Sequence, residues 1–235
     1  MAKTRSKRYQ KAAALLEVGR KYALPEAIST VKKFPAPKFN PTVTVSVRLG
    51  VDPRKSDQMV RGSVSLPHGT GKNVRVVVFA QGAAAEAAKA AGAEHVGYED
   101  LIKMVRDGFT DFDSAIATPD AMAEVRKIAR VLGPRGLMPN PKTGTVTDDT
   151  AKAVKEVKAG RVDYKLDKNG NVAAAIGKLA FSSEQLVDNV NAFVESVVRA
   201  KPASAKGNYI QSVTLTASML PGVALDASSY TKTNA

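Results

Sequence analysis

The side chains in this sequence best suited to chemistry are its cations, and the chemistry they favour is phosphate binding. Four of the first eight residues are basic, namely Lys3, Arg5, Lys7 and Arg8. Among the further cations before residue 69 are Lys32, Lys33, Lys38, Arg48, Arg54, Lys55 and Arg61. Each phosphate neutralised by Lys or Arg releases condensed counterions, and this release favours the binding of any polyanion. For the first eight residues alone, a solvated basic tail is an equal alternative. The whole set favours structured RNA, because no aromatic-rich segment offers stacking for single strands.

Charge is distributed unevenly along the 235 residues, whose formal net charge is +13. Residues 1–68 contain 14 basic and 4 acidic side chains, residues 69–160 contain 13 and 12, and residues 161–235 contain 8 and 6. The two outer segments therefore carry nearly all of the excess positive charge. This distribution indicates that the two outer segments form the part of the protein that binds the polyanion.

Other candidate sites are weaker. His68–Asn73, HGTGKN, resembles a phosphate loop, but it lacks the first glycine and the hydroxyl of that motif and precedes a strand, which favours a turn. Asp111 and Asp113 could share acid and base roles or bind Mg²⁺, but no third carboxylate lies nearby in sequence, and a solvated turn is favoured. The absence of Cys excludes disulfides and thiolate metal sites. No metal or cofactor is expected.

The stretch GPRGLMPNPKTGTV, from Gly133 to Val146, is too rich in Gly and Pro for regular structure. It could present Arg135 and Lys142 to phosphate or form a tip that contacts a partner. It could equally be a rigid connection between two helices.

The middle segment, residues 69–160, alternates short strands with helices. Strands are predicted at Val74–Ala80 and Ser114–Ala117, where β-branched and small apolar residues run together. Helices are predicted at 83–91, 99–106 and 148–158, with another after Thr118-Pro119 that places Met122, Val125, Ala129 and Leu132 on one face and ends at Gly133. This alternation indicates a small three-layer α/β domain.

The outer segments supply the parts of a second domain. Thr42–Leu49 alternates strictly between apolar and polar residues, which is typical of a half-buried strand. A helix is predicted at Pro25–Phe34, and another begins at a capping box formed by Ser182 and Gln185. Further strands are predicted at 161–166, 171–176 and 209–216, and Asn169-Gly170 signals a hairpin between the first two.

Neither outer half holds enough sheet to close a core. We therefore predict a discontinuous α+β domain, residues 1–68 and 161–235, with an antiparallel sheet and helices, carrying an inserted three-layer Rossmann-like α/β domain, residues 69–160. Small residues near Pro67–Gly69 and Ala159–Arg161 suit a hinge between them. The architecture also permits an α/β enzyme that binds a nucleotide or phosphorylated ligand, although its glycine pattern does not support one. A cytosolic protein is expected, because the chain lacks a signal-peptide core and any long apolar run.

Six stretches together resemble the family of large-subunit ribosomal protein one. In chain order they are KFNPTVTVSVRLGVDPRKSDQ, VRGSVSLPHGTGK, DFDSAIATPD, LGPRGLMPNPKTGTV, VKAGRVDYKLDKNG and AKGNYIQSVTLTASM. The resemblance implies a non-catalytic protein whose discontinuous domain binds 23S rRNA at the mobile stalk of the large ribosomal subunit. It also implies assistance in releasing deacylated tRNA from the exit site, repression of its own mRNA, a cytoplasmic location on the ribosome and a monomeric free state.

Carried over position by position, the resemblance implies nine RNA contacts: Glu26, Lys38, Phe39, Thr42, Ser212, Ser218 and Met219, with Asp167 and Lys168 as weaker additions. Among these, the cation suits phosphate, the hydroxyls suit phosphate or ribose 2′-OH, and the Phe and Met side chains suit ribose or base. Glu26 would accept from a 2′-hydroxyl or base amine, or else serve as a first-turn helix acid.

One position departs from the family pattern. The family usually has Thr-Met-Gly where this chain has Ser218-Met219-Leu220. Ser keeps the hydroxyl, whereas Leu adds bulk and removes the easy access to positive φ that Gly provides where backbone approaches RNA. An altered RNA affinity is therefore expected from Leu220.

Overall fold

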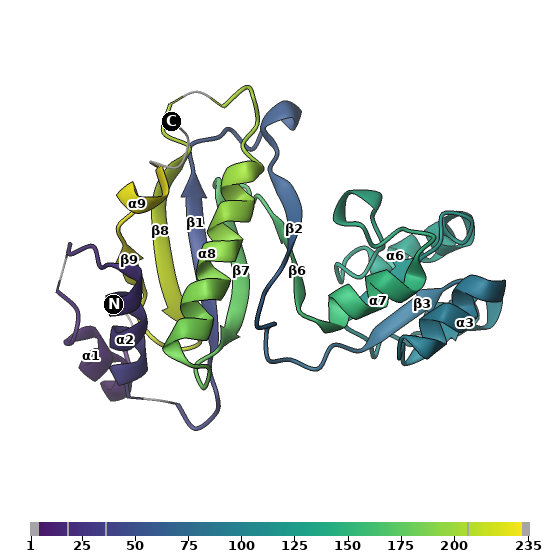
Figure 1. Ribbon diagram of the computed structural model, residues 1–235, viewed down its shortest axis with the longest axis horizontal. Helices are drawn as coiled ribbons and strands as arrows, with labels where there is room; N and C mark the ends of the chain where they lie inside the picture. The colour runs from purple at the N-terminus through teal and green to yellow at the C-terminus, as the bar shows by residue number, and fades with distance from the viewer. Residues whose placement is uncertain (1–4, 18, 36, 206, 232–235) are drawn as a thin grey trace. The chain divides into compact units, whose positions relative to one another are not determined.

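The computed structural model describes residues 5–17, 19–35, 37–205 and 207–231. The chain divides into two compact units: unit 1 comprises residues 1–71 and 162–235, and unit 2 comprises residues 72–161. Unit 1 is thus discontinuous, and unit 2 is inserted within it (Figure 1). The borders expected from the sequence differ from these by 3 residues at the first crossing and by 1 at the second.

Unit 1 is built on a four-stranded antiparallel sheet with the strand order β7-β1-β8-β9. Central β1 pairs on both sides, so that Val45 lies opposite Ala174 of β7 and Leu215 of β8. The predicted alternation is confirmed, because every second residue of β1 from Val43 is buried. The elements of this sheet and the short elements around it are β1 (Thr42–Leu49), β7 (Asn171–Lys178), β8 (Ile210–Ala217), β9 (Val223–Leu225), α1 (Lys7–Ala13), η1 (Ser56–Gln58) and α9 (Ser228–Thr231).

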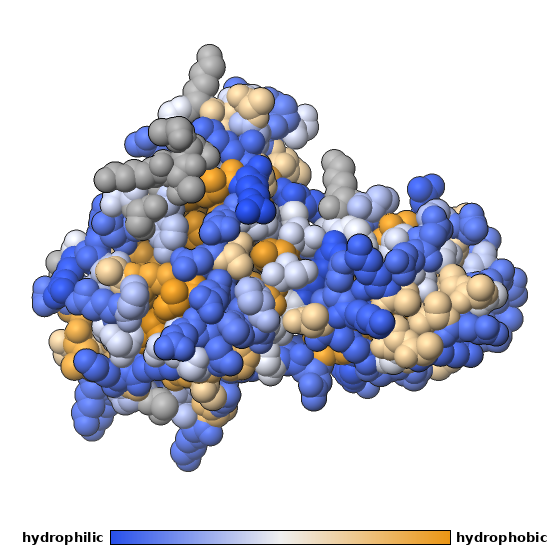
Figure 2. Space-filling model, in the orientation of Figure 1, coloured by the Kyte–Doolittle hydropathy of each residue, from blue (hydrophilic) through white to orange (hydrophobic). Residues whose placement is uncertain are grey.

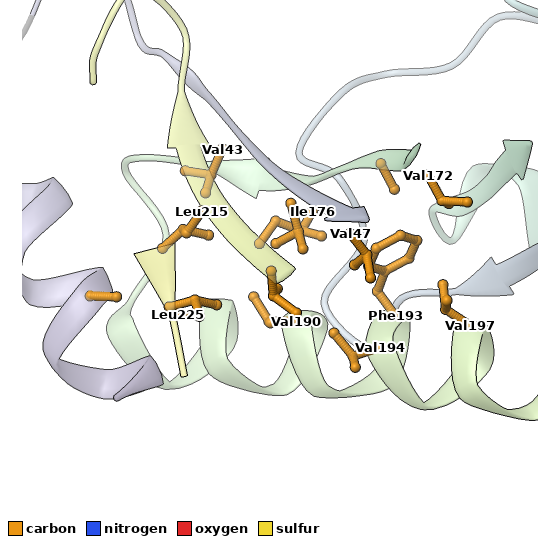
Figure 3. Packing of buried hydrophobic residues seen from close by; sticks show 14 of the residues in the cluster. Val43, Val47, Val172, Ile176, Val190, Phe193, Val194, Val197, Leu215 and Leu225 are labelled. Carbon is orange, nitrogen blue, oxygen red and sulfur yellow. The ribbon is translucent and has the colours of Figure 1, made fainter. Parts of the chain in front are cut away.

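Two helices, α2 (Leu24–Lys33) and α8 (Ser183–Arg199), cover one face of this sheet, and Figure 1 shows α8 lying across the strands. The predicted capping box opens α8: Ser182 Oγ accepts from the N–H of Gln185, whose side chain accepts from the N–H of Ser182. Phe193 of α8 packs in the same buried cluster as Val47 and Ile176 (Figure 3). Burial of this apolar surface drives the assembly of the two chain halves.

The predicted hairpin between residues 161–166 and 171–176 is wrong. The turn itself forms, with the N–H of Gly170 donating to the carbonyl of Asp167 at 3.2 Å. However, β6 (Arg161–Lys165) pairs with β2 (Arg61–Ser65) in a separate two-stranded sheet, while β7 pairs with β1. The turn signal is local, whereas strand pairing is decided by partners distant in sequence.

Unit 2 is a three-layer α/β unit, as predicted. Its parallel sheet has the order β4-β3-β5. Val76 and Val78 of β3 face a core shared with α3 and α7, whereas Val77 and Phe79 face a second core shared with α4, α5, η2 and α6. The elements are β3 (Val76–Phe79), α3 (Gly82–Ala90), β4 (His95–Gly97), α4 (Glu99–Arg106), β5 (Ser114–Ala117), α5 (Met122–Val125), η2 (Arg126–Ile128), α6 (Ala129–Leu132), η3 (Pro141–Thr143) and α7 (Thr150–Lys158).

The continuous helix predicted after Thr118-Pro119 is interrupted by the 3₁₀ turn η2. Ile128 has φ −99° and ψ 10°, outside the helical region. This change places Ile128 in the core with Val125 and Leu132, where a regular helix was expected to place Ala129. Packing against the sheet therefore overrides the simple helical period.

Candidate nucleic-acid interface

The face of the unit 1 sheet opposite the helices is polar and is built from small side chains. In register across β1 and β8, Thr44 lies opposite Thr216, and Ser46 lies opposite Thr214. These residues are only partly buried, whereas their neighbours along each strand are in the core. Short hydroxyl side chains on a flat sheet let a sugar–phosphate backbone approach closely and offer it donors and acceptors.

At one end of this face, two of the predicted contacts lie side by side. Ser218 donates from both its N–H and its hydroxyl to the carbonyl of Thr42, at 3.0 and 3.4 Å. The hydroxyl of Thr42 in turn accepts from the ammonium of Lys178, at 2.8 Å. Lys178, at the end of β7, was not among the predicted contacts. It places a cation within hydrogen-bonding distance of the Thr42 hydroxyl, whose residue is itself bonded to Ser218.

Apolar side chains stand at the same end. Phe39 is 47% exposed and lies in the loop that leads into β1. Two contacts fasten this loop to the end of β7: the N–H of Leu179 donates to the carbonyl of Pro41 at 2.9 Å, and the N–H of Ala180 donates to Asn40 Oδ1 at 3.3 Å. Lys38 is also exposed. The loop that carries the exposed ring and the cation is therefore fastened to the end of β7, next to Lys178.

Met219 follows β8 in an unusual conformation. Its φ is 62°, which makes it the one non-Gly residue with positive φ among those described, and its side chain is 68% exposed. The next residue, Leu220, is 7% exposed and belongs to the core, and its N–H donates to the carbonyl of Ala217 at 2.9 Å. The sequence argument about Leu220 is therefore corrected, because the left-handed conformation falls on Met219. Leu220 anchors the turn while Met219 projects from it.

The other end of the face holds Arg48, which pairs with Ser212 on β8 and with Asn171 on β7. Ser212 is exposed and lies about 20 Å along the strand from Ser218, given the usual rise per residue. The predicted contacts thus span the length of β8. Only Ser218 among the predicted β8-side hydroxyls joins the cluster around Thr42.

The turn between β6 and β7 is attached to this second end. The N–H of Leu49 donates to the carbonyl of Gly170 at 2.8 Å. Asp167 Oδ1 accepts from the N–H groups of Asn171 and Asn169, each at 2.8 Å, and these bonds, the one from Asn171 foremost, lower the pKa of the carboxyl. Asp167 therefore holds the turn, and the exposed Lys168 is the side chain that the turn presents.

Glu26 is engaged elsewhere. It lies in the first turn of α2, and its carboxylate accepts from Arg20 Nη2 at 2.6 Å. Arg20 also binds Glu17 at 3.0 Å, and the two carboxylates, Glu17 foremost, raise the pKa of the guanidinium. No hydrogen bond or ion pair of the described residues joins Glu26 to the sheet face. Glu26 thus occupies the first-turn position of its alternative role, and its contact with RNA stays a prediction.

The opposite side of unit 1 has a different character. A hollow of about 840 Å³ lies between α2, α8, β9 and α9, and Figure 2 shows hydrophobic surface among these elements. Leu24, Val187 and Val194 are among its lining residues, and its charged residues are Glu195, Arg199 and Asp226. With two acids to one cation, this hollow does not suit phosphate.

The remaining sequence candidates have structural partners. The N–H of His68 donates to Asn189, and Lys72 pairs with Asp113 at 2.6 Å, so the HGTGKN stretch forms turns rather than a phosphate cradle. Asp113 also accepts from Arg75, which pairs with Asp111. The bond from Lys72 is the main cause that lowers the pKa of Asp113. In the described part of the chain, no group of three His, Cys, Asp or Glu residues could hold a metal ion.

The loop 133–146 is bonded within itself and to its surroundings. Asn140 exchanges hydrogen bonds with Thr145, whose hydroxyl is 2.7 Å from the N–H of Asn140. Arg135 donates to Thr110, and Arg161 donates to the carbonyl of Thr143. These contacts favour the rigid connection over a free cationic tip. The side chain of Lys142 and the whole of Lys3 lie outside the described residues.

Together, these features define a two-unit α/β protein with a hydroxyl-rich, cation-bordered sheet face, the kind of surface that structural RNA-binding proteins present. Residues 31–221 match the Ribosomal protein L1p/L10e family, and the chain belongs to this family. It is therefore a ribosomal protein and not an enzyme.

Curated relatives agree over nearly the full length. The chain is 56% identical over 226 residues to the large ribosomal subunit protein uL1 of Saccharopolyspora erythraea, covering 96% of this chain and 94% of the relative. It is 55% identical over 221 residues to uL1 of Salinispora tropica (94% and 93% covered), and 53% identical over 222 residues to uL1 of Thermobifida fusca (94% of each). Each helix in the part of the chain that the structure describes is too short or too polar to span a bilayer.

Proposed function

We propose that this protein is a structural component of the large ribosomal subunit, in the cytoplasm, that binds 23S rRNA through the open face of the unit 1 sheet. The observation that carries the proposal is the cluster of Thr42, Ser218 and Lys178, bordered by exposed Phe39 and Met219. Hydroxyls and a cation serve phosphate and ribose, while exposed apolar side chains serve bases. A surface of both kinds favours a folded RNA with some bases turned outward.

The test is a titration of the free protein, expected to be a monomer, against the stalk-region rRNA and a scrambled duplex of equal length, at several salt concentrations. Log affinity should fall with log salt by about 0.7–0.9 per phosphate neutralised, for both RNAs. A preference for the stalk RNA that persists at high salt supports the proposal. If the affinities for the two RNAs coincide at every salt concentration, the surface binds polyanions without specificity.

Release of deacylated tRNA would also depend on cations that bind phosphate. Assistance to deacylated tRNA leaving the exit site needs cations apart from the rRNA-binding face. The β2–β6 ribbon offers such a set: Arg61 and Lys165 are exposed, and they lie next to the bond from the N–H of Leu166 to the carbonyl of Val60. We expect Arg61→Gln with Lys165→Gln to weaken deacylated tRNA binding to ribosomes that contain the variant, while leaving rRNA affinity intact. An equal loss of tRNA binding and rRNA affinity would show that these cations do not form a separate tRNA-binding set.

Repression of the protein's own mRNA requires that one surface reads both RNAs. Unlabelled stalk rRNA should therefore displace a leader fragment of that mRNA in a competition titration, with the same order of variant effects for both RNAs. Displacement that fails at saturating rRNA would separate the two activities and remove the proposed repression through this face.

A further inference from the structure

A second hollow, of about 510 Å³, lies where the N-terminal segment meets the end of β8. Its lining residues are Arg5, Ser6, Arg8, Tyr9, Met219 and Leu220. None of them is acidic, and two of them, Arg5 and Arg8, carry guanidinium groups. The hollow is shallow and open to solvent, so it suits one unit of a bound polymer rather than an enclosed small ligand.

Helix α1 turns one face toward this hollow. Ala12 is fully buried in the unit 1 core, and Arg8 and Tyr9, four and three residues before it, are half-buried on the same face. Lys7 and Lys11 are exposed on the other face. The helix therefore separates its cations into two sets, of which only one lines the hollow.

The groups in the hollow are arranged in a way that suits a nucleotide. The guanidinium of Arg5 lies 4.4 Å from the centre of the Tyr9 ring, and Arg8 Nη2 approaches the carbonyl of Met219 at 3.5 Å. Among the described residues, neither Arg5 nor Arg8 forms an ion pair. The cations are therefore available to an anion, beside the thioether that Met219 projects.

We propose that this hollow is the binding site for one nucleotide of the bound RNA. Arg5 and Arg8 take its phosphate, and Met219 and Tyr9 contact its ribose or base. The guanidinium fork matches phosphate oxygens bidentately, and a thioether and a phenol ring offer apolar surface to a flat base. By holding the Met219 carbonyl, Arg8 also positions a turn that lies 211 residues away in the sequence. The inference extends the proposed RNA binding and depends on it.

The experiment compares two double variants of equal charge change. Arg5→Gln with Arg8→Gln removes the cations that line the hollow, whereas Lys7→Gln with Lys11→Gln removes the same charge from the other face of the same helix. Both are titrated with stalk rRNA across salt concentrations. The Arg pair should lower affinity about tenfold and reduce the salt slope by about 0.7–0.9, as for one phosphate. The Lys pair should change both much less. Thermal unfolding of each variant checks that α1 remains packed.

A second measurement locates the phosphate. Stalk RNAs that carry an uncharged methylphosphonate at one position at a time are bound to the wild type and to the Arg variant. One position should weaken the wild type and leave the Arg variant unaffected. Equal losses of affinity for both double variants would overturn the proposed nucleotide-binding site. So would the absence of any methylphosphonate position that weakens only the wild type. Loss of preference for stalk RNA by the wild type itself would instead overturn the proposed function.

Discussion

Asn189, which is fully buried on α8, accepts a hydrogen bond from the backbone N–H of His68 at 3.1 Å. The same side chain donates to the carbonyls of Gly69 at 3.0 Å and Ile176 at 2.7 Å. One amide therefore attaches the segment just before the unit border to both the helix and the sheet of unit 1. A sequence search for reactive side chains passes over such a residue, because an Asn on a helix carries no motif.

We expect Asn189→Ala to lower the free energy of unfolding by about 2–4 kcal/mol, because it leaves one N–H and two carbonyls without a partner inside the protein. Urea denaturation would measure the loss. Asn191→Ala, on the same helix, removes a half-buried amide that forms no side-chain hydrogen bond with the described residues, and it should cost under about 0.5 kcal/mol. Equal losses for the two variants would show that the bonds of Asn189 add nothing specific.

Leu220 and Met219 should respond oppositely to glycine. Leu220→Gly empties a core position and should destabilise by about 2–5 kcal/mol. Met219→Gly relieves a left-handed conformation and should stabilise by up to about 1 kcal/mol, while losing an exposed side chain. Thermal unfolding and RNA titration on both variants separate the effects: Leu220→Gly should lose mainly stability, and Met219→Gly should lose mainly RNA affinity. A greater loss of RNA affinity from Leu220→Gly than from Met219→Gly, at a temperature where both are folded, would contradict this assignment.

Phe39→Ala and Met219→Ala should each weaken specific RNA binding by about 1–3 kcal/mol, because each removes apolar surface available to a base or ribose. Met104→Ala is the matched control, since Met104 is 46% exposed on α4 of unit 2. Titration with stalk rRNA at fixed salt gives the three affinities. If both unit 1 variants bind like the control, the interface has been placed on the wrong surface.

The sequence predicts local features of this fold well, and misses those that distant partners decide. The capping box of α8 and the alternation of β1 depend on residues a few positions apart, and both are found as predicted. The turn at Asp167–Gly170 also forms, yet its flanking strands pair elsewhere, because nothing within the turn specifies that β7 joins β1. The 3₁₀ break at Ile128 likewise results from packing against a sheet.

The same distinction applies to the site. Thr42 and Ser218 are 176 residues apart in sequence, and the resemblance supplied both positions without the bond between them. Lys178 was missed, although the polar residues that alternate with the buried valines of β1 could have indicated an open face with partners on the neighbouring strands. Asp167 and Glu26 came with the resemblance, and the structure gives each a local partner that sequence alone does not reveal.

The pH dependence of stability should include a contribution from Asp113. The ammonium of Lys72, with support from Arg75, holds the pKa of this carboxyl below its ordinary value near 3.8. Because the folded pKa lies below the unfolded one, the stabilisation is fully present above the unfolded pKa and is lost as pH falls through the folded pKa. Lys72→Met should therefore flatten the acid side of the stability profile measured by urea denaturation between about pH 2 and 6. An unchanged profile would show that the pair does not contribute.

Charge reversal should separate the two units in RNA binding. Residues 69–160 contain 13 basic and 12 acidic side chains, so their summed field is weak, whereas residues 1–68 contain 14 and 4. Exposed charges more than about 10 Å from the RNA are screened at 0.1 M salt. Lys38→Glu with Arg48→Glu, at the two ends of the proposed face, should therefore lower stalk rRNA affinity by more than about a hundredfold, from two lost phosphate contacts and two new repulsions. Lys89→Glu with Lys152→Glu, an equal charge change in unit 2, should cost less than about threefold. Equal losses from the two pairs would show that unit 2 shares the RNA surface and that the uneven charge does not mark the part of the protein that binds the polyanion.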